Sequence, residues 1–120
     1  MHSARLLEYF QDARRAGELS APALGVDVSN PACGDMLRLT VRFEDDRVAD
    51  ARFQVRGCTA AIAAASALTD WMIGKSAAEL RALKPAVIED AVGGLEPASK
   101  HAAVLCVDGV KSVLGMLNTK

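Results

Sequence analysis

The chain has 120 residues and a mass of 12.6 kDa, which suits one domain over residues 1–120 that buries roughly two-thirds of its unfolded surface. Its 14 basic and 15 acidic residues nearly cancel, so no charge field favours nucleic acid as a partner. No apolar run reaches the roughly 18 residues of a membrane span, and no signal-peptide pattern follows Met1, so we expect a cytoplasmic protein with no membrane partner.

The first 29 residues predict one helix and a connection. Apolar residues recur at helical spacing over residues 3–15, with Ser3 as a candidate N-cap and Gly17 as a candidate stop, and the arginines of this segment are assigned to its solvated face. Proline, glycine and serine then become frequent over residues 18–29. We expect a loop there, with at most a short strand near residues 26–28.

Two stretches of alternating apolar and polar residues predict an antiparallel hairpin. The first covers residues 36–43, a turn follows at residues 44–46, and the second covers residues 48–56. The side chains expected to face inward are Leu37, Leu39, Val41, Phe43, Ala49, Ala51, Phe53 and Val55, and those expected to face outward on the first strand are Arg38, Thr40 and Arg42.

Helical segments follow the hairpin. Residues 59–73 contain six alanines and several larger apolar residues, and they predict a buried central helix because apolar side chains cover much of its circumference. Aromatic residues make up only 4% of the chain, so small side chains should set the packing distance. Ser76 and Glu79 have capping-box spacing, and Pro85 can begin a further helix. Ser99 can cap a last helix that ends near residue 117, with an apolar stripe formed by Ala103, Val107, Val110, Leu114 and Leu117.

A thiol and a carboxylate, Cys33 and Asp35, stand two residues apart on a turn ahead of the hairpin. Pro31 cannot donate a backbone hydrogen bond and Gly34 tolerates positive φ, so this pair should lie on an exposed loop. Cys58 follows the second strand, so the hairpin brings both thiols to the same end. It also begins the central helix, whose positive dipole end favours a thiolate. These residues predict half of a metal site, although inert cysteines in a small core remain an alternative.

Two further residues of the last helix carry metal-binding groups. His101 lies near the start of that helix, on the face turned away from the apolar stripe, which favours a surface or site role over a packed one. Cys106 borders the stripe, which favours a buried thiol. The three cysteines cannot all pair within one chain, and a cytoplasmic protein keeps them reduced and able to bind metal.

Four short motifs in the same order resemble the IscU/NifU iron-sulfur cluster scaffolds: residues 31–35 (Pro-Ala-Cys-Gly-Asp), 50–53, 57–58 and 71–75. The resemblance covers most of the chain from Asn30 onward. It implies a compact α+β domain with a three-stranded antiparallel sheet, helices on one face and an exposed site at one end. In that domain residues 1–17 form an N-terminal helix, residues 18–29 a loop or short strand, and residues 30–120 the core that carries the motifs.

The resemblance also implies a ligand set. Family members hold a nascent cluster with three cysteines and one aspartate, and Cys33, Asp35 and Cys58 occupy matching positions. Ala102 occupies the third cysteine position, directly after His101. The next thiol, Cys106, lies one helical turn further on, a displacement of about 6 Å that a metal-sulfur bond of roughly 2.3 Å cannot span. We therefore expect His101 to be the fourth ligand, with Cys106 as its substitute if the helix begins differently.

The function implied by the resemblance is that of a scaffold without enzymatic activity. It would hold iron or a transient [2Fe-2S] cluster, receive sulfide from a cysteine desulfurase, and pass the cluster to apo acceptor proteins. An alternative is a zinc-binding relative that accepts persulfide sulfur without holding a cluster, because two thiolates, a carboxylate and an imidazole also suit one zinc or ferrous ion. A small interaction module with structural thiols is a third hypothesis, and homo-oligomerisation stays open.

Overall fold

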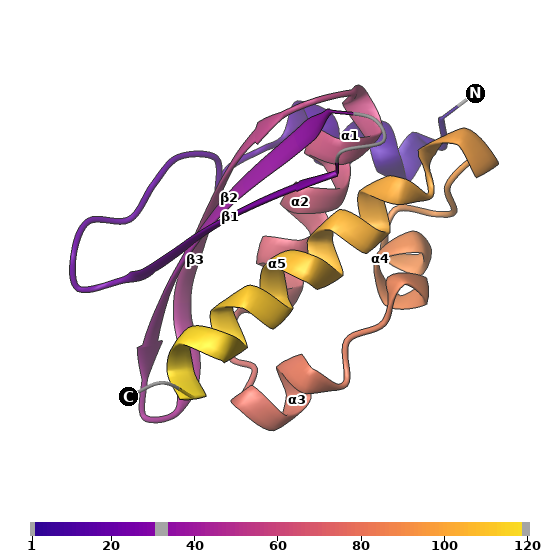
Figure 1. The fold of residues 1–120 in the computed structure, drawn as a ribbon. Helices are drawn as coiled ribbons and strands as arrows, with labels where there is room; N and C mark the ends of the chain where they lie inside the picture. Colours follow the sequence, from indigo (N-terminus) through magenta and orange to yellow (C-terminus); the bar gives the residue numbers. More distant parts are fainter. Residues whose placement is uncertain (1, 31–33, 119–120) are drawn as a thin grey trace.

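An antiparallel sheet with the strand order β1-β2-β3 forms one layer, and helices pack on its inner face (Figure 1). The computed structural model describes residues 2–30 and 34–118. Helices α2 and α5 lie directly on the sheet, with α5 across β1 and β2 and α2 against β3. The α+β class with three antiparallel strands is therefore confirmed. In chain order the elements are α1 (Ala4–Gln11), β1 (Leu24–Asn30), β2 (Asp35–Glu44), β3 (Arg47–Arg56), α2 (Thr59–Met72), α3 (Ala77–Arg81), α4 (Pro85–Ala91), a 3-10 turn (Pro97–Ser99) and α5 (His101–Asn118).

The predicted hairpin between β2 and β3 is confirmed, but its register differs near the turn. Asp45 and Asp46 both have positive φ, of 53° and 65°, as the tight turn between twisted strands requires. A shift between Arg42 and Phe43 pairs Phe43 with Val48. Val48 is therefore the buried residue, and the expectation that Ala49 faces inward is wrong, because the irregularity adds one residue to the alternation.

The segment after α1 covers the free edge of β3. Helix α1 ends at Gln11, earlier than the predicted residue 15, and the chain then runs beside β3, where the Phe53 N–H donates to the carbonyl of Arg15. The Arg15 guanidinium contacts Asp50 and Asp70 at 3.3 and 3.0 Å. The assignment of Arg15 to a solvated helix face is therefore wrong, since it fastens this segment to β3 and α2.

Two other differences concern the burial of Thr40 and the length of β1. The Leu19 N–H donates to the hydroxyl of Thr40 at 3.0 Å, so Thr40 is buried although it points away from the helices. Its predicted exposure is wrong because residues outside the sheet cover it. Strand β1 covers seven residues, more than the short strand expected near residues 26–28, since pairing with β2 extends it.

The helices largely follow their predicted signals. The six alanines of α2 are all buried, and Gly109 lets α5 approach the sheet so closely that an added Cβ would lie 3.0 Å from the Leu37 side chain. The capping box of Ser76 and Glu79 forms as predicted. Ser99 does not cap the last helix, because it belongs to the 3-10 turn and α5 begins at His101.

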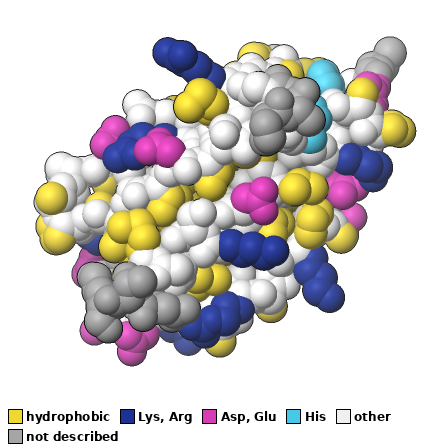
Figure 2. Space-filling model, in the orientation of Figure 1, with side chains coloured by type: hydrophobic (Ala, Val, Ile, Leu, Met, Phe, Trp, Pro, Cys, Tyr) yellow, Lys and Arg dark blue, Asp and Glu magenta, His cyan; other side chains and the backbone are white. Residues whose placement is uncertain are grey.

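Both signs of charge occur on the visible surface. On the face in Figure 2, several Lys and Arg side chains lie beside Asp and Glu side chains. Within residues 2–30 and 34–118, no helix combines the length and apolar character needed to cross a bilayer.

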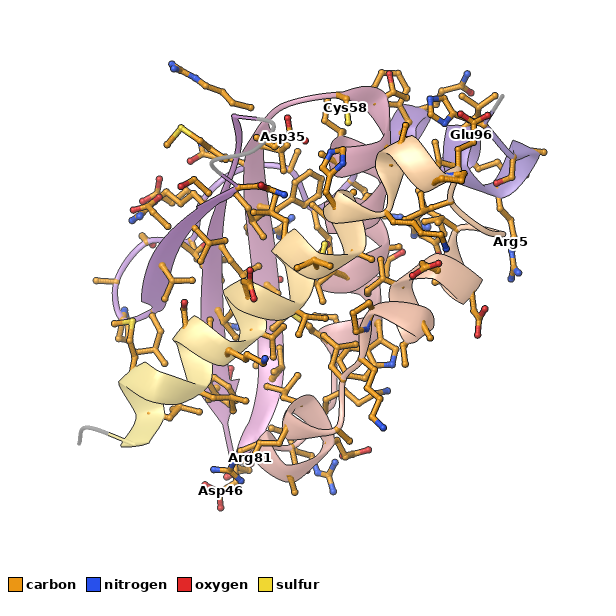
Figure 3. The ribbon with its side chains drawn as sticks, turned by 45° about the vertical axis from the view of Figure 1, so that its right-hand side comes forward. Arg5, Asp35, Asp46, Cys58, Arg81 and Glu96 are labelled. Atoms are coloured by element: carbon orange, nitrogen blue, oxygen red, sulfur yellow. The ribbon has the colours of Figure 1, made fainter. Side chains whose placement is uncertain are left out.

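Four chain segments meet at one end of the sheet: the start of β2, the end of β3, and the first residues of α2 and α5. Figure 3 shows Asp35 and Cys58 close together at this end, with Asp46 and Arg81 at the opposite end. The antiparallel hairpin causes this arrangement, because β2 begins where β3 ends.

Candidate metal centre

Three different ligand atoms converge at this end of the sheet. Nε2 of His101 lies 3.0 Å from Oδ2 of Asp35, and Sγ of Cys58 lies 3.6 Å from the same oxygen and 3.9 Å from Nε2. All three atoms lie within 4.8 Å of one another. One metal ion can therefore be reached by all three side chains with small adjustments.

Asp35 provides the oxygen atom from the first residue of β2. It pairs with Asn30 of β1, and strand alternation turns its side chain to the same face as the buried Leu37. Only 6% of Asp35 is exposed. The carboxylate therefore lies at the inner side of the site, where Oδ2 contacts the other two donors.

Cys58 provides the sulfur atom from the N-cap position of α2. Its side chain makes no capping hydrogen bond, and the residue is exposed, so the sulfur remains open to a ligand. The N-terminal end of α2 places the positive end of the helix dipole beside this sulfur, as the sequence predicted. Both features suit a thiolate that binds metal.

His101 provides the nitrogen atom from the first residue of α5. Its side chain is 24% exposed, and its Nε2 points toward the Asp35 carboxylate, 3.0 Å from Oδ2. The next residue, Ala102, is fully buried. The first turn of α5 thus directs His101 to the site and Ala102 into the core.

The other two cysteines are Cys33 and Cys106. Cys33 lies outside the described residues. Cys106 is buried, as its position beside the apolar stripe predicted, and it is not among the three gathered donors. Burial raises the pKa of the Cys106 thiol to about 12, which disfavours the thiolate that metal binding needs.

The donor chemistry fits iron or zinc. Thiolate and imidazole bind Zn²⁺ and Fe²⁺ well, and a carboxylate is an acceptable third ligand. The resemblance put Asp35 and His101 in one expected ligand set, but no sequence pattern predicts that these residues, 66 positions apart, contact each other directly. Sequence reasoning could nominate both residues but not their distance.

A family model and individual proteins of known name match this chain. The family model described as "NifU-like N terminal domain" matches residues 1–120. The chain is similar to two proteins named iron-sulfur cluster assembly scaffold protein IscU. The protein from Escherichia coli K12 is 31% identical over 123 residues, which cover 99% of this chain and 95% of that one. The protein from Azotobacter vinelandii is 33% identical over 117 residues, covering 94% and 91%.

Solved structures agree with the fold. A crystal structure from Fervidobacterium islandicum AW-1 matches with a TM-score of 0.78 at 18% identity, covering 94% of this chain and 96% of that one. The N-terminal part of a nitrogen-fixing NifU-like protein from Brucella abortus matches with a TM-score of 0.64 at 25% identity, covering 92% and 77%.

Proposed function

The chain belongs to the NifU-like N-terminal domain family, and from this premise we propose that it is an iron-sulfur cluster assembly scaffold and not an enzyme. Its cargo is iron or a transient [2Fe-2S] cluster. The sulfur comes from a cysteine desulfurase, the finished cluster goes to apo acceptor proteins, and the protein works in the cytoplasm. The names of its relatives support the scaffold, and nothing in them favours the zinc-binding sulfur acceptor.

The convergence of Asp35, Cys58 and His101 is the observation that supports this proposal most strongly. These three residues come from β2, from the N-cap position of α2 and from α5, so only the folded chain gathers them. With Cys33 as the fourth ligand, the set would contain two thiolates, one carboxylate and one imidazole. A [2Fe-2S] cluster needs four terminal ligands, and histidine replaces cysteine in some known centres.

The arrangement suits cargo that must leave again. Cys58 is exposed and His101 is partly exposed, so a partner protein can approach the cluster directly. The hard carboxylate oxygen of Asp35 is a poor match for the soft cluster iron, compared with a third thiolate. We infer that this ligand set holds a cluster less firmly than three cysteines would, which favours transfer.

The experiment that tests the function is anaerobic cluster assembly. Protein purified without oxygen is analysed for metal, supplied with ferrous iron and sulfide, and followed by its visible absorption. Cluster bands that disappear when an apo ferredoxin is added, with matching gain of cluster by the ferredoxin, are the expected result. Tightly bound zinc, with no cluster bands after iron and sulfide are supplied, would contradict the scaffold proposal. The variant Cys106→Ala is the matched control, since it removes a thiol outside the gathered donors.

A further inference from the structure

Gly57 stands directly behind the carboxylate of Asp35. A Cβ atom added at Gly57 would lie 2.7 Å from Cγ, 2.7 Å from Oδ1 and 3.1 Å from Oδ2 of Asp35. Real Cβ atoms essentially never approach other atoms closer than 3.0 Å, so any side chain at this position must displace the carboxylate or the backbone. An added Cβ atom and the Asp35 carboxylate would therefore compete for the same space.

The backbone at Gly57 does not itself require glycine. Its φ lies outside the left-handed range, in contrast to Gly34, where φ is +76° and an added Cβ would meet nothing within 4 Å. Glycine at position 34 therefore allows the positive φ of the turn, whereas glycine at position 57 leaves room for the Asp35 carboxylate. A glycine without a conformational need costs folding entropy, so it calls for a packing reason, and the three atoms nearest to an added Cβ all belong to Asp35.

We propose that Gly57 is a positioning residue for the metal centre, which keeps the Asp35 carboxylate within reach of Cys58 and His101. The inference rests on the proposed metal site. Gly57, which follows the last residue of β3, leaves room for a ligand that comes from β2. Asp35 is 6% exposed, so a carboxylate pushed from this corner has little free space on the inner side of the site.

The tolerance for such a displacement is small. Metal and catalytic groups must stay within about 0.5 Å of their productive positions to function. Oδ2 of Asp35 already contacts both other donors, at 3.0 Å from Nε2 and 3.6 Å from Sγ. A shift large enough to relieve a 2.7 Å contact therefore breaks this arrangement while leaving Cys58 and His101 in place.

Cobalt binding in the parent protein and three variants tests the proposal: Gly57→Ala, Asp35→Ala and the double variant. Co²⁺ alone is titrated anaerobically, and its absorption bands report both affinity and the donor set. Gly57→Ala should weaken binding by about tenfold or more, as removal of supporting groups around a metal does, and should give the same bands as Asp35→Ala. In the Asp35→Ala background, Gly57→Ala should add less than about a twofold loss.

A purely structural role for Gly57 predicts a different pattern. If the corner between β3 and α2 needs glycine for itself, Gly57→Ala will weaken binding equally in both backgrounds, and that result would overturn the proposal. Gly109→Ala is the matched control, since its Cβ would lie 3.0 Å from a side chain of the core, away from the donors. It should change thermal stability and leave the cobalt bands unchanged.

The metal-free protein separates this inference from the proposed function. The ¹⁵N resonances of the His101 ring report its contact with Asp35, with or without a metal site. Gly57→Ala should shift the Nε2 resonance in the same direction as Asp35→Ala does. If the parent binds no cobalt but this shift occurs, the metal site is refuted and the positioning of Asp35 stands. An unchanged Nε2 resonance in Gly57→Ala refutes the positioning itself.

Discussion

Replacing His101 with alanine should weaken metal binding far more than replacing Cys106 with alanine. Structural zinc sites with four ligands bind with about 10–16 kcal/mol, which is roughly 3 kcal/mol for each ligand, or more than 100-fold in affinity. Water can take the vacated position on this partly exposed side of the centre, so we expect His101→Ala to cost at least about tenfold.

Cys106→Ala should act on the core instead. The thiol is 1% exposed, and it is not among the gathered donors, so metal affinity should stay within about twofold. Loss of one buried sulfur should cost about 1 kcal/mol of unfolding free energy. For a chain of 120 residues this lowers Tm by about 4 °C. A lower Tm would show that Cys106→Ala alters the core. Unchanged metal affinity in the same variant would then show that Cys106 is not a ligand.

Both variants are measured by anaerobic Co²⁺ titration against a competing chelator, and by thermal unfolding of the metal-free protein. Loss of metal from Cys106→Ala, combined with retention in His101→Ala, would refute the assignment and make Cys106 the ligand. In that case α5 would have to begin or rotate differently from the arrangement seen here. Affinity within twofold of the parent in both variants would show that α5 supplies no ligand at all.

Three other outcomes are expected. Cys33→Ser and Cys58→Ser should each abolish bound metal with only a modest change in Tm, because too few strong ligands remain; full metal occupancy in either variant would argue against a shared site. Asp35→Ala should keep the fold and lengthen the lifetime of an assembled cluster. The lifetime is measured from the decay of the cluster's visible absorption bands. A lifetime equal to or shorter than that of the parent would exclude a labilising role for Asp35. In a variant with Cys33 and Cys58 replaced by serine, Cys106 is the one thiol that remains, and it should resist a thiol reagent between about pH 8 and about pH 9. Burial raises the pKa of Cys106 to about 12, so the reactive thiolate is scarce below that pH. Rapid labelling of the native variant would show that Cys106 is accessible.

Short-range patterns in the amino-acid sequence predict most of the secondary structure and the candidate ligand residues. Alternating residues set the hairpin, the alanine-rich run set α2, and the capping box and Pro85 set the starts of α3 and α4. These features depend on neighbours a few residues apart, which a pattern can record. The choice of Asp35, Cys58 and His101 came from residue type, short spacing and family resemblance, and Gly57 entered only as part of a two-residue motif in that resemblance.

How these elements pack together depends on contacts between distant segments of the chain. Thr40 is buried by a loop that no strand pattern records, and Val48 replaces Ala49 inside because the strand register shifts next to the turn. The 3.0 Å contact between His101 and Asp35 joins residues 66 positions apart, so it depends on how α5 crosses the sheet. Side-chain packing between distant segments sets such distances, and a one-dimensional pattern contains the residues without their separation in space.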